Sequence, residues 1–219
     1  ASYSFKKSIG QPVIYPKNAL DYCANFLYMM FAVPSEPYEV DEDMVKALNM
    51  LLILHADHEQ NCSTSTVRMV GSSDANLFAS IAAGICALWG PKHGGANQEV
   101  IEMLDEISRP ENARAWIEEA LARGDRLMGF GHRVYRVRDP RADALKTAVR
   151  RMSEGSNSHP GRIAFAEAVE AAALAILREQ KPDRALDTNV EFYTALLLEA
   201  LAFPPAAFTC VFAMCRVAG

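Results

Sequence analysis

The chain is 219 residues long and half of its residues are hydrophobic, which is enough to bury the core of one large domain or two small ones. The 22 Lys and Arg residues against 27 Asp and Glu residues give a net charge of −5. This acidic balance excludes a general attraction for nucleic acid or anionic membranes, so we expect neither as a partner. An anionic ligand would have to be held by a local cluster of basic side chains.

Helix signals recur along the whole chain and strand signals are nearly absent, so we predict an all-α protein. Asn18 is expected to cap a helix ending near Phe31, and Asp41 one ending near Ala56. Residues 59–66, EQNCSTST, are expected to form a polar loop before an Ala-rich helix at 77–89, which is apolar on all sides and therefore belongs in a core. Further helices are expected at 94–107, 111–123, 140–154, 162–180, 190–203 and 206–217.

The segment 96–203 is richer in charge and in amphipathic helices than the apolar segments on either side of it. We predict that it forms a smaller domain inserted into a large domain made of residues 1–95 and 204–219. No basic segment followed by an apolar one opens the chain, and the longest apolar stretch, 195–214, is interrupted by Glu199 and by Pro204 and Pro205. These features predict a cytoplasmic protein.

The cysteines predict reduced thiols rather than disulfides or metal ligands. They stand at Cys23, Cys62, Cys86, Cys210 and Cys215. They form no CxxC pair and mostly fall in apolar helical runs, which indicates burial in a cytosolic protein. His55 and His58 are spaced like zinc ligands, but their order does not match HExxH or HxxEH and no third ligand has a useful spacing. We expect no metal, and interpret His58 as a ligand-contacting or hydrogen-bonded interior histidine.

His93 stands where one apolar helix ends and the next begins, in the segment PKHGG. A histidine at or just before a helix N-terminus is held as the neutral imidazole, because the helix dipole disfavours the imidazolium. A neutral ring can donate a hydrogen bond to a developing enolate oxygen, and the glycines allow close approach of a substrate. The alternative is a histidine that merely ends a turn.

A second cluster of candidate residues follows the glycine-rich GFGH segment that ends at His132. The DPR segment ending at Arg141 fits the N-cap, N1 and N2 positions of a helix. A guanidinium beside free backbone N–H groups would hold a carboxylate or phosphate. Two alternatives are an ordinary capping sequence with a solvated arginine, and an exposed basic patch for a phosphorylated cofactor. That patch would consist of Arg133, Arg136 and Arg138.

Two further charged residues occupy unusual positions. Arg216 ends an apolar helix, so its guanidinium has to find a counter-anion or reach water. Glu191 follows Asn189, which is expected to cap a helix and so to stabilise the ionised carboxylate, the form that acts as a base. The alternative for Glu191 is a first-turn glutamate with no function.

The chain resembles the citrate synthase family in five ordered motifs, LHADHEQNCSTSTVRMVGSS, GPKHGGANQEV, MGFGHRVYRVRDPR, NVEFYTALLLEAL and FAMCR. SIGQPVIYP is most similar to the bacterial forms, and the resemblance covers essentially the whole chain. It implies an all-helical homodimer, or a higher homo-oligomer, whose large and small domains close over the substrates. It also implies the condensation of acetyl-CoA with oxaloacetate and water to give citrate and CoA, without a metal or cofactor.

The resemblance implies a role for each matching residue. His93 and Glu191 would enolise the acetyl group, and His132 would polarise and protonate the oxaloacetate carbonyl. Oxaloacetate would be bound by His58, Arg141 and Arg216. The adenine end of CoA would be received by the loop of Leu127, Met128, Gly129, Phe130 and Gly131. We expect the three histidines, the two arginines and Glu191 to converge on one site.

Two features depart from the family pattern. The family has Asp where Glu191 stands, and the additional methylene would move the carboxylate by about 1 Å. The chain also begins where family members are well under way and stops soon after Arg216, so we expect the N-terminal part of the large domain and the C-terminal tail to be missing. Three alternatives stay open: a 2-methylcitrate synthase that uses propionyl-CoA, a non-catalytic member that retains the fold, and a citryl-CoA lyase-like enzyme.

Overall fold

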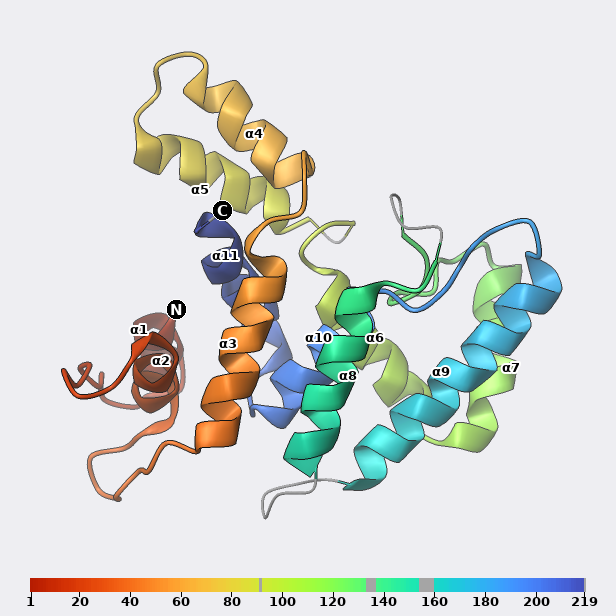
Figure 1. Cartoon of the computed structure of the whole chain (residues 1–219), viewed down its shortest axis with the longest axis horizontal. Helices are drawn as coiled ribbons and strands as arrows, with labels where there is room; N and C mark the ends of the chain where they lie inside the picture. The colour runs from red at the N-terminus through yellow and green to blue at the C-terminus, as the bar shows by residue number, and fades with distance from the viewer. Residues whose placement is uncertain (91, 133–136, 154–159, 219) are drawn as a thin grey trace. The chain divides into compact units, whose positions relative to one another are not determined.

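The computed structural model describes residues 1–90, 92–132, 137–153 and 160–218, with the helical backbone of α9 beginning at Pro160 (Figure 1). The chain separates into two compact units. Unit 1 consists of Ala1–Asp57 and Cys210–Gly219, and unit 2 of His58–Thr209. This division differs from the large and small domains expected at 1–95, 96–203 and 204–219, and those domain boundaries remain a prediction.

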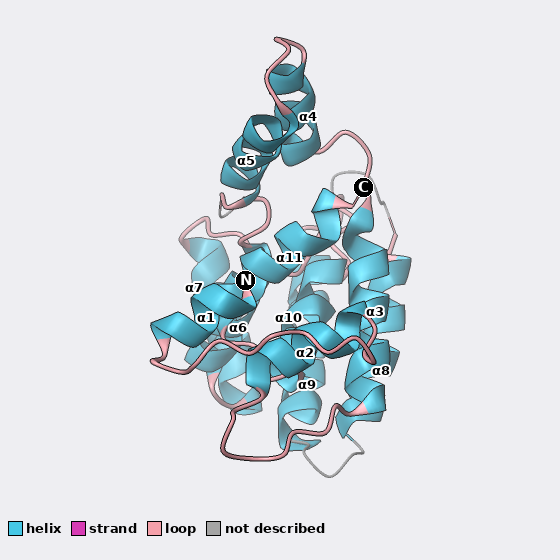
Figure 2. Cartoon of the chain, turned by 90° about the vertical axis from the view of Figure 1, so that its left-hand side faces the viewer, coloured by secondary structure: helices cyan, strands magenta, loops and turns pink. Residues whose placement is uncertain are grey.

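The prediction of an all-α fold is confirmed, because the described residues form helices joined by loops (Figure 2). Unit 1 holds α1 (Ser2–Ser8), α2 (Tyr22–Phe31), α3 (Glu42–Ala56) and most of α11 (Phe208–Val217). Unit 2 holds α4 (Cys62–Gly71), α5 (Leu77–Leu88), α6 (Ala96–Ile107), η1 (Pro110–Asn112), α7 (Ala113–Ala122), α8 (Pro140–Ser153), α9 (Pro160–Gln180), α10 (Val190–Ala200) and η2 (Pro205–Ala207). Within the described part, an isolated bridge pairs Phe130 with Thr188 in the antiparallel sense.

Two helices of unit 1, α2 and α3, begin at acidic N-caps. Asp41 accepts hydrogen bonds from the backbone N–H groups of the first turn of α3, as predicted. The predicted cap at Asn18 is wrong, because Asp21 accepts from Ala24 N at 2.8 Å and starts α2 there. Sequence analysis missed α1, whose Lys6 is fully buried and donates to the carbonyl of Ala32 at 2.6 Å. A buried ammonium needs such acceptors, because desolvation without them is costly.

The predicted loop at 59–66 is wrong, because α4 begins inside it. The side chain of Asn61 accepts from Thr64 N at 3.1 Å and so caps α4. Polar composition had suggested a loop, but serine and threonine are also common in the first turn of a helix. Helix α4 then packs along α5 within unit 2 (Figure 1).

The prediction that α5 is buried on all sides is also wrong. It turns small residues toward α4: Gly84 is buried, and a Cβ there would clash with Val67. Leu88 at its end is buried, but three of its large apolar side chains are exposed, Leu77 at 66%, Phe78 at 82% and Ile85 at 42%. An exposed apolar face of this kind is typical of an interaction surface.

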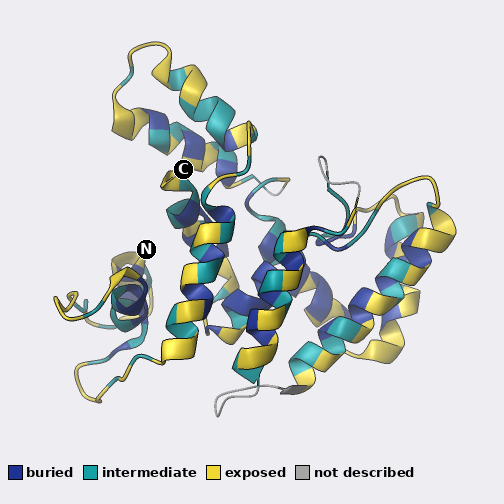
Figure 3. Ribbon diagram, in the orientation of Figure 1, coloured by how far each residue is buried: buried dark blue, intermediate teal, exposed yellow. Residues whose placement is uncertain are grey.

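The core of unit 2 is centred on α10, which packs against α6 and α8 (Figures 1 and 3). Every residue from Phe192 to Leu198 is buried, so the helix is apolar nearly all round. The long helix α9 packs against both α7 and α8. Because of this packing, the segment before α8 lies beside the segment before α10.

A buried glutamate, Glu170 in α9, is held by four donors from other parts of unit 2. It is 4% exposed and accepts from Tyr193 Oη at 2.5 Å, Thr188 Oγ1 at 2.6 Å, Arg138 Nη1 at 2.9 Å and Lys146 Nζ at 3.0 Å. Burial by itself raises the pKa of this carboxyl, but the four hydrogen bonds outweigh burial and lower the pKa to about 2. The glutamate is therefore ionised throughout the physiological range.

Unfolding at acid pH should report this carboxylate. Because its pKa in the folded protein, about 2, lies below the ordinary value of 4.5, its stabilising contribution is complete above pH 4.5 and is lost as the pH falls toward 2. We expect the urea midpoints of the parent protein and of Glu170→Gln to differ most near neutral pH, to approach each other below pH 4.5 and to converge only near pH 2. A difference that stays constant between pH 7 and pH 3 would contradict this assignment.

The cysteine prediction is correct only in part. Cys23 and Cys215 are buried as predicted, but Cys62, Cys86 and Cys210 are exposed. The described residues contain no group of three or more His, Cys, Asp or Glu side chains placed to hold a metal ion. In the same residues no single helix is long and apolar enough to cross a membrane, and residues 190–217 reach that length only as two helices bent at a break.

Candidate active site

His58 and His132 are in direct contact in unit 2. Their Nε2 atoms are 3.1 Å apart and their ring centroids 5.0 Å apart. Burial is the largest influence on His132 and lowers its pKa; Asp139 opposes that effect and Arg141 reinforces it. His132 is therefore a neutral imidazole at pH 7 and can share one proton with His58. The turn before α4 that carries His58 includes Glu59 in the left-handed region at φ 53°, a conformation that a non-glycine residue adopts only under constraint.

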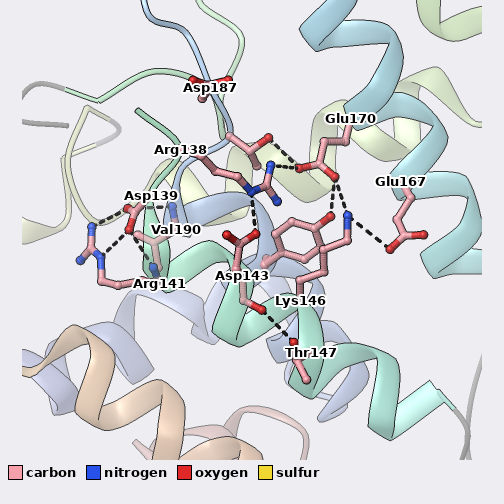
Figure 4. Close-up of polar contacts among 12 residues, drawn as sticks. Arg138, Asp139, Arg141, Asp143, Lys146, Thr147, Glu167, Glu170, Asp187 and Val190 are labelled. Atoms are coloured by element: carbon pink, nitrogen blue, oxygen red, sulfur yellow. Dashed lines mark hydrogen bonds and ion pairs between the residues drawn. The ribbon is translucent and has the colours of Figure 1, made fainter. Parts of the chain in front are cut away.

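Arg141 is locked by a buried carboxylate two residues before it (Figure 4). Asp139 is 1% exposed, and it accepts from the backbone N–H of Arg141 at 3.0 Å, from Nε at 3.1 Å and from Nη2 at 2.8 Å. The prediction of Asp139 and Arg141 as N-cap and N2 of a helix is confirmed, since α8 begins at Pro140. The alternative of a solvated arginine is wrong: the Arg141 side chain is 12% exposed and ion-paired.

The same carboxylate connects Arg141 to the segment of Glu191. Oδ2 of Asp139 accepts from the backbone N–H of Val190 at 3.2 Å, directly before Glu191 in the chain. Burial alone raises the pKa of Asp139, but the hydrogen bonds and charge of Arg141 prevail and hold the pKa below its ordinary value. Asp139 is therefore an anionic connection between the candidate oxaloacetate-binding arginine and the candidate base.

Asn189 links the segments of His132 and Glu191. Its side-chain oxygen accepts from Glu191 N at 3.0 Å, which confirms the predicted cap, and its Nδ2 donates to the carbonyl of Gly131 at 2.8 Å. Its backbone N–H donates to the carbonyl of Gly129 at 2.9 Å. Both glycines have positive φ, and a Cβ at Gly129 would lie 2.9 Å from the Phe192 ring, so a side chain at 129 is excluded twice over.

His93 lies in the turn between α5 and α6, three residues before α6 begins at Ala96. Its Nε2 lies 3.3 Å from the backbone nitrogen of Ser63 and 3.0 Å from Ser63 Oγ. A backbone N–H can only donate, so this contact puts the lone pair on Nε2 and the proton of the neutral ring on Nδ1. Ser63 stands in the first turn of α4, five residues after His58. The contact therefore links His93 to the segment that carries His58.

Arg216 belongs to unit 1 and contacts other residues of that unit. Its Nε donates to the carbonyl of His55 at 2.9 Å, and its guanidinium carbon lies 5.0 Å from the centre of the Phe212 ring. The guanidinium is thus in contact with a backbone acceptor and an aromatic face. The predicted role of Arg216 in oxaloacetate binding remains a prediction.

The loop predicted to receive CoA is closely packed. Leu127 and Phe130 are each 7% exposed, and the Phe130 ring lies 5.4 Å from that of Phe192. The more accessible part of this loop is Met128 and Gly131, which are half-buried. The alternative of an exposed basic patch is wrong for Arg138, which is paired with Asp143 at 2.6 Å and with Glu170. Arg133 and Arg136 lie outside the described residues.

Sequence analysis missed the groups that hold the candidate residues in place. It identified Asp139 and Asn189 as helix caps but not as the links among the Arg141, Glu191 and His132 segments. Ser63 was hidden in a supposed loop, although Asn61 followed by serine and threonine is itself a helix-start signal. Among the candidates, the structure directly joins His58 to His132 and connects Arg141 and Glu191 through Asp139.

The geometry defines a class of protein: an all-α protein with imidazoles, a carboxylate-locked arginine and a helix-capped glutamate in one unit. Such a set suits proton transfer next to a bound carboxylate. The citrate synthase C-terminal domain family matches the chain over residues 1–219. The chain therefore belongs to the citrate synthase family.

Individual relatives agree with this family. Citrate synthase 1 of Mycobacterium tuberculosis is 49% identical over 222 residues, which is 100% of this chain and 51% of the relative. The crystal structure of citrate synthase from Thermotoga maritima matches with a TM-score of 0.83 at 31% identity and covers 100% of this chain, 56% of its own. Citrate synthase from Pyrobaculum aerophilum matches with a TM-score of 0.87 at 38% identity, again over 100% of this chain and 52% of its own.

A further match is the ternary complex of citrate synthase from Thermoplasma acidophilum with carboxymethyl coenzyme A and oxaloacetate. Its TM-score is 0.87 at 27% identity, over 100% of this chain and 56% of that protein. The chain spans about half the length of the curated relatives it matches.

Proposed function

We propose that this protein condenses acetyl-CoA with oxaloacetate and water to give citrate and CoA. The observation that carries the proposal is the connected set in unit 2: the His58–His132 contact, and the Asp139 carboxylate that holds both Arg141 and the segment of Glu191. Support also comes from the relatives, which are named citrate synthases, and from the Thermoplasma acidophilum structure, which holds oxaloacetate and a CoA analogue.

In the proposed first step, Glu191 removes a proton from the thioester methyl group and His93 stabilises the enolate oxygen. The methyl group is a weak acid, so the step needs both a carboxylate at the carbon and a donor at the oxygen. The contact with Ser63 leaves the proton of His93 on Nδ1, which makes that atom the candidate donor. Asn189 caps the helix at Glu191 and so favours the ionised, basic carboxylate.

In the proposed second step, the enol carbon attacks the carbonyl carbon of oxaloacetate, and His132 supplies a proton to the carbonyl oxygen. Arg141 binds a carboxylate of the dianion, and its pairing with Asp139 fixes its orientation before the substrate arrives. His58, which is in contact with His132, would bind oxaloacetate beside this carbonyl group. Water then cleaves the citryl thioester, which releases citrate and CoA with its thiol.

The test is thiol release by the full-length protein with oxaloacetate and either acetyl-CoA or propionyl-CoA. We expect CoA release with acetyl-CoA that requires oxaloacetate. A faster rate with propionyl-CoA would make the protein a 2-methylcitrate synthase instead. If neither acyl-CoA releases thiol while oxaloacetate still binds in calorimetry, the proposal is wrong and the chain is a non-catalytic member of the family.

We also propose that the protein is a cytoplasmic homodimer, with the outer face of α5 in the subunit contact. Leu77, Phe78 and Ile85 form this exposed apolar face. Patches of large apolar side chains are rarely left in water, and two copies of one helix can cover each other across a two-fold axis.

Phe78→Glu is expected to weaken the dimer, since it places a charge on the apolar face at its most exposed side chain. Loss of an anchor worth about 2 kcal/mol would raise the dimer dissociation constant about 30-fold. Analytical ultracentrifugation of the full-length protein measures this change. The matched control is Ile53→Glu on α3, where a side chain 65% exposed also becomes charged and the dimer should persist. Equal dissociation constants for the two variants would exclude α5 from the contact.

A further inference from the structure

Two segments of unit 2 carry candidate active-site residues where they enter helices, in the first turn of each helix. Residues 138–141 lead into α8 and carry Arg141, and residues 187–191 lead into α10 and carry Glu191. Asp139 connects them near their active-site ends, as described above. A second connection joins Arg138, one residue before Asp139, to Thr188, two residues before Val190 (Figure 4).

That second connection is the carboxylate of Glu170, and each of its two oxygens accepts hydrogen bonds from a different pair of donors. Oε1 accepts from the two segments, from Thr188 Oγ1 at 2.6 Å and Arg138 Nη1 at 2.9 Å. Oε2 accepts from the helices that follow them, from Tyr193 of α10 at 2.5 Å and Lys146 of α8 at 3.0 Å. One side chain of α9 therefore holds both the segments and the helices that follow them.

The charges around Glu170 make this arrangement specific. Arg138 and Lys146 are also paired with Asp143 and Glu167, at 2.6 Å and 3.4 Å, so each cation stands between two carboxylates. Charge-assisted hydrogen bonds in a buried setting are strongly directional. Shifting either segment would leave Glu170 with a buried lone pair that has lost its donor.

We propose that Glu170 is a positioning residue for the condensation: it fixes the segment of Arg141 relative to the segment of Glu191 and so sets the separation between oxaloacetate and the base. The inference rests on the proposed function, because it assigns Arg141 and Glu191 their roles from that function. Glu170 itself acts through the residues that it holds.

Glu167 provides a matched control for a purely structural role. It stands three residues before Glu170 on α9 and pairs with Lys146 at 3.4 Å and with Arg150 at 2.6 Å. Both of these partners belong to α8, at positions after residues 138–141. Glu167→Gln therefore removes the same charge from the same helix, and both variants lose an ion pair with Lys146.

The test compares Glu170→Gln with Glu167→Gln in the full-length protein. Rates are expressed per folded, active enzyme molecule. We expect Glu170→Gln to lower kcat/KM for oxaloacetate about 10- to 100-fold, which is the loss typical of a misplaced reacting group. The KM for acetyl-CoA should not change. Glu167→Gln should retain parental values. If Glu170→Gln only lowers the fraction of folded protein and the remainder has parental kcat and KM, the role is structural and the proposal is overturned.

A second pair of variants decides the question if Glu170→Gln does not fold. Thr188→Val removes one hydroxyl donor to Glu170 with little change of shape, and Thr188→Ser retains it. We expect the valine variant to lose kcat/KM for oxaloacetate in the same sense and the serine variant to restore it. Equal losses in both variants would overturn the proposal.

Hydrogen exchange separates this inference from the proposed function. The amide of Val190, which donates to Asp139, should exchange about tenfold faster in Glu170→Gln or Thr188→Val, and at the parental rate in Glu167→Gln. If the parent protein releases no CoA, the condensation is overturned whatever the exchange shows. If the parent is active and Val190 exchanges equally in all variants, only the role of Glu170 is overturned.

Discussion

Glu191→Gln is expected to slow the exchange of acetyl-CoA methyl protons into heavy water by about 10²- to 10⁴-fold, the usual worth of a general base, while oxaloacetate affinity stays nearly unchanged. The amide is nearly the same size as the carboxylate but cannot take a proton. Oxaloacetate would be held by Arg141 and the histidines, so its binding is not expected to depend on this side chain. Proton exchange is measured by NMR and oxaloacetate affinity by calorimetry, both on the full-length protein.

Glu191→Asp is the informative companion variant, because the family pattern has the shorter side chain at this position. Exchange in the aspartate variant should equal or exceed that of the parent, provided the cap by Asn189 is retained. The glutamine result alone identifies the base: exchange at the parental rate in Glu191→Gln would leave Glu191 as an ordinary first-turn glutamate.

Asp139→Ala is expected to reduce the free energy of unfolding by about 3–5 kcal/mol, as is typical when one partner of a buried ion pair is removed. Three donors of Arg141 and the amide of Val190 lose their acceptor together. Urea denaturation at pH 7 measures the change. Oxaloacetate affinity should fall as well, since the arginine is no longer held in one orientation.

The chain contains a matched control in Arg123 and Asp125. This pair has the same residue types and the same separation of two residues, but its side chains are 51% and 53% exposed, against 12% and 1% for Arg141 and Asp139. Asp125→Ala should change stability by less than about 1 kcal/mol, because exposed ion pairs are weak. Similar losses in the two variants would show that burial does not determine the strength of the Asp139 pair.

Much of the fold could be predicted from the sequence, because the caps are local. Asp41, Asp139 and Asn189 each precede a helix-forming run and each starts a helix in the structure. The failures have physical causes as well. Residues 59–66 looked too polar for a helix, but the side chain of Asn61 accepts from the N–H of Thr64 and starts α4. The apolar sequence of α5 suggested burial, but the small residues that face α4 leave three of its large side chains exposed.

The candidate residues could be found from motifs, whereas the groups that hold them could not. Glu170 is an example, since a glutamate in the Ala-rich run EAVEAAALA looks like part of a solvated helix face. Its burial arises only when α8, α10 and Thr188 pack around it. Ser63 likewise becomes a partner of His93 only through tertiary contact. Partners that are distant in sequence carry no local signal.

The 3.1 Å contact between the two Nε2 atoms of His58 and His132 has room for one hydrogen only. A second hydrogen would set two N–H bonds head to head, so the protonation states of the two rings are tied together and they titrate as a pair. Either tautomer of the pair leaves one ring donating to the other. A ligand carbonyl that accepts a hydrogen bond from His132 at Nε2 must therefore break into this contact and take the shared hydrogen from His58. Under the proposed function, substrate binding at His132 therefore redirects the shared hydrogen away from the histidine contact before the condensation.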